Sequence, residues 1–335
     1  MAMAQVRDVA ALAGVSPATV SNALNHPHRV SARTLAKVQA AIEELGYVRN
    51  DAARQLRAGS NPAVGMIVLD AANPYFTDVA HGAEQHLAEL GRPLLLGNSA
   101  QREEQELTYL RLFDEQRVAG VLIAPVGDVL PKLRTLKDHG TSVVIIDRKA
   151  GADEFSSVSV NDEQGGWLVA DHLIDQGARR IAVIGGPGSL RQVRHRLHGT
   201  QQRADRTDGA TVEFLDTGAM DTASGRETVQ RLLERPRDEW PEAIFATNDL
   251  VALGALQVLA RAGVEVPGEI MLAGYDDIEF AASATIPITS VRQPSEEMGR
   301  QAAELLRQAI EDPAAAVQHT VFQPELMVRE STSAH

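Results

Sequence analysis

The first 46 residues contain three short stretches in which apolar side chains recur with helical spacing. Within residues 6–13 the apolar positions follow the i, i+3, i+4, i+7 pattern of one helix face. Gly14 ends this stretch. Ser16 followed by Pro17 suits a helix N-cap and first helical residue, so a second helix should run from Pro17 to about Leu24. Two short helices around a glycine-containing turn predict a helix-turn-helix.

A third helix is predicted between Ser31, which can cap its start, and Gly46, which can end it. Its apolar side chains recur along one stripe. These are Leu35, Val38, Ile42 and Leu45. Three amphipathic helices of this kind predict one small all-α core.

The outer face of the second predicted helix is unusual for a surface helix. Val20 and Leu24 should point toward the core. The outward positions hold small or short polar residues that fit against base edges and phosphates, where an ordinary surface helix carries Glu and Lys. They are Pro17, Ala18, Thr19, Ser21, Asn22 and Asn25. A three-helix bundle with no nucleic-acid role is the alternative, and this face favours contact with DNA.

Residues 47–59, YVRNDAARQLRAG, combine a short helical pattern with positive charge. Asn50 can cap a helix through Leu56 or Arg57, but about seven residues are too few for a helix that is stable alone in water. We therefore expect this segment to order on contact with a partner. Leu56 between Arg54 and Arg57 has the composition of an apolar wedge inserted between base steps in a minor groove. A solvated linker is the alternative.

From residue 64 onward, short apolar runs alternate with amphipathic helices. Continuous apolar strands separated by helices predict parallel sheets that are covered on both faces. The runs form two sets of four, which predicts two similar lobes. The predicted strands are 64–70, 92–99, 120–126 and 141–147, then 179–186, 212–216, 243–249 and 270–277, with further candidates in SVRQP and TVFQPELMVRE.

The charges of the chain are unevenly distributed. Of its 335 residues, 45 are acidic and 32 basic, a net charge of −13, yet the first 60 residues hold seven basic and four acidic side chains. A basic N-terminal segment, the head, followed by an acidic remainder, the body, is typical of a protein in which only the head binds phosphates. The chain has no cysteine, which excludes disulfides and thiolate ligands. Neither a signal peptide nor a membrane-spanning run is evident, so we expect a cytoplasmic protein.

Polar and aromatic side chains follow several predicted strands of the body. In open parallel sheets, ligands bind beyond the carboxyl ends of the strands. Carboxylate, amide and guanidinium groups suit the hydroxyls of a sugar, and an aromatic ring suits its apolar face. The candidate ligand-binding residues are Tyr75, Phe76, Asp147, Arg148, Arg196, Asn248 and Asp276. The alternatives are an ion pair of Asp147 with Arg148, a helix cap at Asn248, and core positions for Tyr75 and Phe76.

The signatures of enzymes are weak or missing. The run GGPGSL at 185–190 follows an apolar strand, but Pro187 and the missing third glycine spoil a dinucleotide-binding loop. No nucleophile elbow, Walker lysine or HExxH motif occurs. His195 and His198 lack a third metal ligand. We expect neither an enzyme nor a cofactor or metal site.

The stretches VRDVAALAGVSPATVSNALN and VSARTLAKVQAAIEELGYVRNDAARQLR, together with the body, closely resemble the lactose-repressor (LacI/GalR) family of bacterial transcription regulators. The resemblance implies that the second helix enters the major groove and that a hinge helix from each of two subunits inserts a leucine at the operator centre. The DNA-binding candidates it implies are Ser16, Pro17, Ala18, Thr19, Ser21, Asn22, Asn25, Arg29, Asn50, Ala53, Leu56 and Arg57.

The resemblance also implies domain boundaries and an allosteric ligand. We expect a helix-turn-helix domain at 1–48, a hinge and linker at 49–61, and a two-lobed, periplasmic-binding-protein-like domain at 62–335. Its first lobe should comprise about 62–160 and 291–330, and its second about 161–290. Asn161-Asp162 reverses the order common in the family, and Leu190 stands where a purine-binding relative has arginine. Both differences limit what can be inherited, and the second favours a carbohydrate.

The sequence thus predicts a repressor of a carbohydrate operon that binds a palindromic operator and whose operator affinity a small sugar controls. No leucine-heptad tail follows Arg329, so we expect a homodimer. A nucleoside, purine or phosphorylated metabolite is the alternative ligand, and Arg191 and Arg194 near Arg196 suit a phosphate or carboxylate. A sugar-binding protein or an enzyme on the same two-lobed fold is the alternative function.

Overall fold

The structure is a computed structural model that describes residues 4–47, 61–148 and 154–333. These residues fall into two compact units, one within residues 1–60 and one within residues 61–335. Each unit is described by itself. No helix in the described part of the chain is long and apolar enough to cross a membrane.

The first unit has the three predicted helices. They are α1 (Val6–Ala13), α2 (Pro17–Asn25) and α3 (Ala32–Leu45), with a short 3-10 turn, η1 (Pro27–Arg29), between the last two. Ser16 caps α2 by accepting from the backbone N–H of Thr19 at 3.1 Å, and Ser31 caps α3 in the same way. Gly14 ends α1 with φ of +65°, a left-handed conformation that glycine adopts without steric cost. The predicted helix boundaries are confirmed to within one residue.

The core of this unit is small and built mostly from alanine and valine. Its buried members are Val9, Ala10, Ala13, Val20, Ala23, Val38 and Ala41. Leu35 and Ile42 of the predicted stripe pack against this core and are partly buried. Leu45 differs from the prediction, because it lies in the last turn of α3 and remains exposed.

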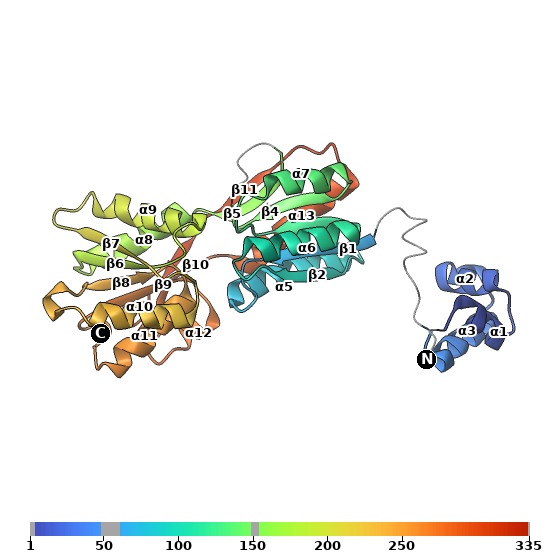
Figure 1. Ribbon diagram of the computed structural model, residues 1–335, viewed down its shortest axis with the longest axis horizontal. Helices are drawn as coiled ribbons and strands as arrows, with labels where there is room; N and C mark the ends of the chain where they lie inside the picture. Colours follow the sequence, from blue (N-terminus) through green and yellow to red (C-terminus); the bar gives the residue numbers. More distant parts are fainter. Residues whose placement is uncertain (1–3, 48–60, 149–153, 334–335) are drawn as a thin grey trace. The chain divides into compact units, whose positions relative to one another are not determined.

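The first lobe of the second unit contains a six-stranded parallel sheet in the order β11-β5-β4-β3-β1-β2 (Figure 1). Helices α5 (Pro74–Glu89) and α13 (Ser295–Glu311) pack on one face, and α6 (Glu103–Glu115) and α7 (Leu130–Asp138) on the other. The strands are β1 (Asn61–Val68), β2 (Leu94–Asn98), β3 (Val118–Ile123), β4 (Ser142–Ile146), β5 (Ser156–Val160) and β11 (His319–Phe322).

The second lobe repeats this architecture with the strand order β12-β10-β9-β8-β6-β7. Helices α8 (Asp162–Asp175) and α9 (Arg191–Ala204) pack on one face of its sheet, and α10 (Thr222–Leu233) and α11 (Asp249–Arg261) on the other, with η2 (Arg237–Glu239) and α12 (Glu279–Ala282) in the connections. The strands are β6 (Arg180–Gly185), β7 (Thr211–Asp216), β8 (Ala243–Ala246), β9 (Met271–Asp276), β10 (Thr289–Arg292) and β12 (Glu325–Met327).

All eight predicted strands of the body form, and β5 is a strand that the apolar pattern did not predict. The lobe assignment near the C-terminus is corrected, because β10 and β12 belong to the second sheet and not to the first lobe. Val291 of β10 is in register with Tyr275 of β9, and β12 runs antiparallel to β10. Only α13 and β11 from the range 291–330 pack in the first lobe. The chain therefore crosses between the lobes near residues 161, 293 and 323.

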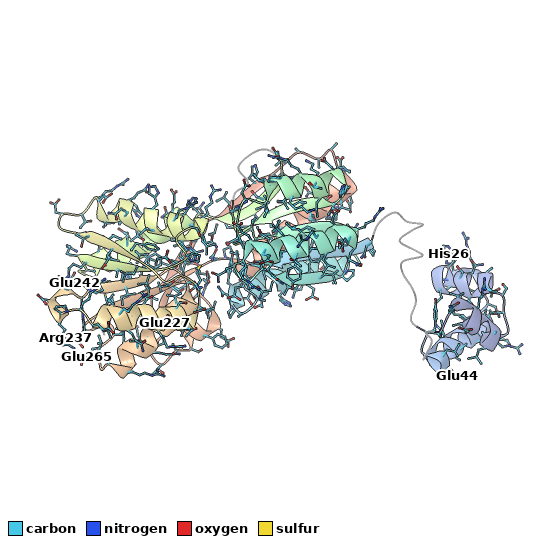
Figure 2. All side chains as sticks on the ribbon, viewed as in Figure 1. His26, Glu44, Glu227, Arg237, Glu242 and Glu265 are labelled. Carbon is cyan, nitrogen blue, oxygen red and sulfur yellow. The ribbon has the colours of Figure 1, made fainter. Side chains whose placement is uncertain are left out.

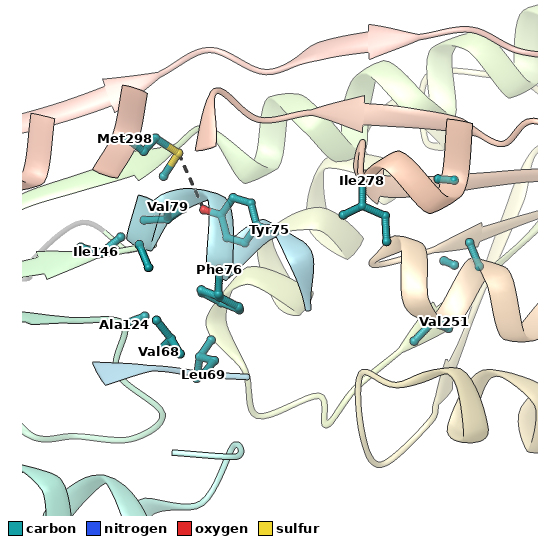
Figure 3. Close-up of a cluster of buried hydrophobic side chains, with 14 of the residues drawn as sticks. Val68, Leu69, Tyr75, Phe76, Val79, Ala124, Ile146, Val251, Ile278 and Met298 are labelled. Carbon is teal, nitrogen blue, oxygen red and sulfur yellow. Dashed lines mark hydrogen bonds between the residues drawn. The ribbon is translucent and has the colours of Figure 1, made fainter. Parts of the chain in front are cut away.

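The strands of each lobe alternate their apolar side chains between the two faces, so each sheet supports two layers of core. In the first lobe, for example, Met66 faces α5 and α13, whereas Ile67 packs with α6 and α7. One end of the layer that contains Met66 faces the second lobe. Figure 3 shows Val68, Val79 and Ile146 clustered at this end. These packed layers hold the strand ends, and the side chains that follow them, in fixed positions.

Candidate functional site

The predicted DNA-contact face of α2 is open to solvent. Pro17, Ala18 and Asn22 are exposed, and Thr19 and Ser21 are partly buried. Ser16 is also exposed, but its hydroxyl already caps α2 and lies 2.9 Å from the Thr19 hydroxyl. Arg29 is exposed at the end of η1. The face therefore presents short side chains that allow a close approach to another surface.

The remaining predicted DNA contacts are outside what the structure describes. Asn50, Ala53, Leu56 and Arg57 all lie in the range 48–60, outside the described residues. Asn25 is the last residue of α2, and its side chain is likewise not described.

A cavity of about 370 Å³ lies between the two lobes of the body. Six of the seven predicted ligand-binding residues line it, from both lobes. The full lining is Leu69, Asp70, Asn73, Tyr75, Phe76, Gln101, Asp147, Leu190, Gln192, Arg196, Met220, Asn248 and Asp276. The seventh, Arg148, lines a neighbouring cavity instead. The mixed apolar and polar lining of the cavity between the lobes is that of a small-molecule site.

Among the described residues, Arg196 supplies the one guanidinium in the lining of this cavity, and it is 2% exposed. Its Nε donates to Asp162 Oδ1 at 2.7 Å, and its Nη1 donates to the Thr247 carbonyl oxygen at 2.6 Å. The guanidinium carbon lies 3.6 Å from the centre of the Tyr275 ring, in a cation–π contact. The same Nη1 is 3.9 Å from Asp276 Oδ1. These contacts fix the guanidinium plane at the cavity wall.

The position of Arg196 depends on close packing between α8 and α9. A Cβ at Gly166 of α8 would lie 2.0 Å from the carbonyl oxygen of Arg196, and one at Gly199 of α9 would lie 1.9 Å from that of Glu163. Only glycine permits this approach, because any larger residue would push the helices apart. The approach brings Arg196 within reach of Asp162 at the start of α8.

Two carboxylates occupy equivalent places at the ends of β4 and β9. Asp147 and Asp276 both have positive φ, +64° and +104°, a backbone conformation that non-glycine residues rarely adopt. Such strain is held by surrounding structure and is found mostly at functional sites. Both side chains are buried at the cavity.

Hydrogen bonds to these carboxylates cross from one lobe to the other. Asn73 of the first lobe donates to Asp276 Oδ2 at 2.9 Å, and Gln192 of the second lobe donates to Asp147 Oδ2 at 3.3 Å. Within their own lobes, Tyr75 donates to Asp147 at 3.2 Å and Gln293 donates to Asp276 at 2.8 Å. Each lobe thus donates a hydrogen bond to a carboxylate of the other.

Burial controls the electrostatics of this cluster. Burial raises the pKa of Asp147 to about 8, and the negative charge of Asp162 adds to the rise. Burial also raises the pKa of Asp276, to about 6, although Arg196 and the bonds from Asn73 and Gln293 oppose the shift. Burial alone would lower the pKa of Arg196, but the surrounding acids, Asp162 first, raise it above its ordinary value. The cavity therefore holds one permanent cation among acids whose charge varies near neutral pH.

The aromatic pair belongs to the core as well as to the cavity. Tyr75 and Phe76 begin α5, and their rings meet edge to face at 4.9 Å. Both lie in the apolar cluster of Figure 3, where the Tyr75 hydroxyl also reaches the sulfur of Met298. Asn248 has a similar double role, because it caps α11 by accepting from Val251 N–H and donates to the Met220 carbonyl. The structural alternatives considered for these residues therefore hold alongside their place at the cavity.

Sequence reasoning missed several residues of the lining. Asp70 lies two residues after the end of β1 and could have been found by the rule that identified the other strand ends. Gln192 stands four residues before Arg196 on α9, a spacing that places both on one helix face. Gln101 and Met220 follow no strand or helix pattern that predicts them. No group of three or more potential metal ligands occurs in the described part of the chain.

Comparison with known proteins decides the family. Residues 5–50 match the family described as bacterial regulatory proteins, lacI family, and residues 170–332 match a periplasmic binding protein-like domain. The HTH-type transcriptional repressor PurR of Aliivibrio fischeri (strain MJ11) is 33% identical over 332 residues, which cover 98% of each chain. This chain belongs to the lacI family. The resemblance noted in the sequence and the predicted fold class are thereby confirmed.

Two further relatives of this lacI family member span its length. The ribose operon repressor of Escherichia coli (strain K12) is 34% identical over 335 residues, covering 98% of this chain and 100% of the relative. The crystal structure of the lac repressor dimer bound to operator and the anti-inducer ONPF has a TM-score of 0.80 and 27% identity, covering 99% of this chain and 100% of that one. The likeness therefore includes both the head and the two-lobed body of this lacI family regulator.

Proposed function

We propose that this protein is a sequence-specific transcriptional repressor whose affinity for operator DNA is controlled by a small polyol, most simply a sugar, bound between its lobes. One observation carries the proposal. A helix-turn-helix with a short polar outer face shares a chain with a buried interlobe cavity whose walls offer carboxylates, amides and one fixed guanidinium.

The DNA-binding part of the proposal rests on the exposed face of α2. Pro17, Ala18 and Asn22 are the residues we assign to base edges in the major groove. Ser16, Ser21, Asn25 and Arg29 are assigned to the DNA backbone or to neighbouring contacts. Residues 49–61, with Leu56 as the minor-groove wedge, are assigned to the hinge.

The ligand class follows from the chemistry of the cavity. Asp147 and Asp276 accept hydrogen bonds from hydroxyls, Asn248 and Gln192 donate or accept, and Arg196 supplies a fixed donor. The hydroxyl groups of a neutral polyol can pair with this set of hydrogen-bond donors and acceptors. An anion in this inner cavity would face Asp70 and Asp276, so these acids disfavour it.

Control of DNA binding follows from the bonds that cross the cleft. Asn73 to Asp276 and Gln192 to Asp147 join the lobes only when they are close together. A ligand that bridges the same groups binds the closed arrangement more tightly than an open one, and so shifts the population of states. That difference in affinity is what couples the ligand to the operator.

The operator-bound form is proposed to be a homodimer on a palindromic site. One helix-turn-helix reads only half of such a site. The body also exposes leucines on one region of its first lobe, Leu95 and Leu96 of edge strand β2 and Leu107 and Leu112 of α6. Burying these apolar side chains against a second copy would stabilise the pair.

A nucleoside or purine remains the second candidate ligand, because the PurR repressor spans this chain at 33% identity. Leu190 in the cavity wall argues against it, since an apolar side chain offers no hydrogen bond to a base. As a regulator of this family, the protein is proposed to be cytoplasmic and not to be an enzyme.

The test is operator binding by fluorescence anisotropy, with a palindrome from upstream of the protein's own gene and a panel of pentoses, hexoses, deoxyhexoses and nucleosides. We expect one sugar to change the operator affinity. The sign of the change distinguishes an inducer, which weakens binding, from a corepressor, which tightens it. A response only to a nucleoside would overturn the sugar assignment, and no binding to any palindromic fragment would overturn the repressor assignment.

A further inference from the structure

A second, larger cavity adjoins the first and opens to solvent between the lobes. It shares Asp147 and Gln192 with the inner cavity, so a ligand could extend from one into the other. Its remaining walls come from the loops after β3 and β4 in the first lobe and from the start of α9 in the second. We call it the outer cavity.

Three guanidinium groups line the outer cavity. Arg148 follows β4 in the first lobe, and its Nη1 donates to the Gly127 carbonyl oxygen at 3.2 Å. Arg191 and Arg194 lie in the first turn of α9 in the second lobe, where Arg191 Nε bonds His195 Nε2 at 3.3 Å. Positive side chains from opposite lobes therefore face one cavity.

The arginines from the two lobes repel each other. Burial lowers the pKa of Arg148, and the positive charge of Arg191 is the next cause of the same shift. His195 also has a lowered pKa, from burial first and from Arg191 second, so its ring is neutral near pH 7. Closing the lobes brings like charges together, which costs free energy unless an anion lies between them.

Glu106 and Asp128 of the first lobe oppose the lowering of the Arg148 pKa. Glu103 and Asp128 line the same cavity from the first lobe, but both are exposed, where solvent screens their charge. Asp147 is buried, and its raised pKa of about 8 leaves it largely protonated near pH 7. Arg148 and Arg191 are both partly buried, so solvent screens their charge less than that of the exposed Arg194.

We propose that the outer cavity is a phosphoryl-binding subsite in which Arg148 and Arg191 hold one phosphate from opposite lobes. The phosphate is either an ester on the ligand of the inner cavity or a free inorganic ion bound beside it. Guanidinium groups bind phosphate through paired, charge-assisted hydrogen bonds. Ser189 and the first N–H groups of α9 add neutral donors at the same wall.

This subsite deepens the proposed function and rests on it. The inner cavity selects hydroxyls, and the outer cavity selects an anion attached to them or bound next to them. Because the phosphate would bridge two lobes, its binding favours the closed arrangement. A phosphorylated polyol would therefore bind more tightly than its neutral parent.

The test uses isothermal titration calorimetry on the full-length protein with three probes: inorganic phosphate, ribose and ribose 5-phosphate. Each is titrated into the wild type, into Arg148→Gln and into Arg237→Gln. Arg237 is the matched control, because it is an exposed arginine at the end of the second lobe remote from both cavities (Figure 2). Phosphate bound by the basic head is the same in all three proteins, so the comparison isolates the outer cavity.

We expect Arg148→Gln to weaken phosphate or ribose 5-phosphate binding by about tenfold or more, as for loss of a charged hydrogen-bond partner, and Arg237→Gln to leave it unchanged. Tighter binding of ribose 5-phosphate than of phosphate identifies an ester, and equal binding identifies the free ion. Arg191→Gln replaces Arg148→Gln if the latter fails to fold. If Arg148→Gln binds each phosphate probe as tightly as the wild type does, or if the wild type binds neither probe, the subsite is overturned. A neutral sugar that changes operator affinity would then still support the proposed function.

Discussion

Asn73 and Asp276 are joined by a 2.9 Å hydrogen bond across the cleft, although 203 residues separate them in the chain. The Asn73 side chain does two things at once, because its Oδ1 caps α5 while its Nδ2 donates to the carboxylate of the opposite lobe. Opening the cleft must break this bond. A ligand that offers a hydroxyl between the two side chains can replace it, which ties occupancy of the cavity to the spacing of the lobes.

The first prediction concerns Asp276→Ala. Removing this carboxylate leaves Asn73 and Gln293 without their acceptor and takes a hydroxyl acceptor from the cavity. We expect the ligand response of operator binding to disappear while operator binding itself persists, because the head is untouched. Anisotropy titrations with and without ligand measure both. Asp208→Ala, an exposed acid in the same lobe, is the control, and a retained response in Asp276→Ala would remove Asp276 from the site.

The second prediction concerns Arg196→Gln and stability. The change leaves Asp162 buried without its cationic partner, and breaking a buried ion pair by removing one member costs about 3–5 kcal/mol. Urea unfolding followed by circular dichroism measures the loss. Arg237→Gln in the same lobe removes an exposed ion pair with Glu269 and a cation–π contact with Trp240, so we expect a loss of no more than about 1–2 kcal/mol. Similar losses in both variants would contradict the buried-pair interpretation.

The third prediction is a pH dependence of folding stability. The folded-state pKa of Asp147 is raised to about 8 and that of Asp276 to about 6, so the folded state binds more protons than the unfolded state between about pH 4 and pH 8. The free energy of unfolding contributed by these groups is therefore greatest below pH 4 and falls as pH rises, by up to about 1.4 kcal/mol per pH unit and group.

Asp147→Asn isolates the contribution of that residue, because the amide cannot ionise. Urea unfolding of the ligand-free protein at pH 5, 6, 7 and 8 should show a weaker decline in the variant than in the wild type. Parallel declines in the two proteins would show that Asp147 does not carry the effect.

The fourth prediction concerns Leu56→Ala in the proposed hinge. If Leu56 is a minor-groove wedge, its loss should weaken specific operator binding by a few kcal/mol, the scale of unstacking a base step. Ligand binding should not change, because the cavity lies entirely in the body. Anisotropy on operator and on random DNA distinguishes specific from nonspecific binding. An unchanged operator affinity would remove the wedge assignment.

The fifth prediction concerns self-association. Leu96 is 48% exposed on edge strand β2, and an acid placed there would be buried unpaired in the proposed dimer. Leu96→Asp should therefore shift the protein toward monomer in sedimentation velocity. Val328→Asp, at a residue 50% exposed in the C-terminal segment after β12, is the control and should leave the dimer intact. A wild type that sediments as a monomer or a stable tetramer would contradict the dimer.

The sequence by itself determined the local elements and the residues that end the strands. Helix caps at Ser16 and Ser31, the glycine stops at Gly14 and Gly46, and the apolar strands all depend on neighbours within a few positions. Such short-range preferences can be recognised from the amino-acid sequence alone. Asp147 and Asp276 were predicted because they directly follow strands, and parallel strands present their carboxyl ends at one edge.

Only the tertiary structure decided which of these residues share a cavity. Arg148 follows Asp147 in sequence, yet Asp147 lines both cavities whereas Arg148 lines only the outer one. Gln192 and Gln293 bind the site carboxylates from a helix and from a crossover between lobes, so neither follows the strand ends that identified the other site residues. The paths of β10 and β12 into the second sheet likewise depend on pairing between strands distant in the chain. Contacts of this kind are fixed by the packing of whole lobes, which no local pattern records.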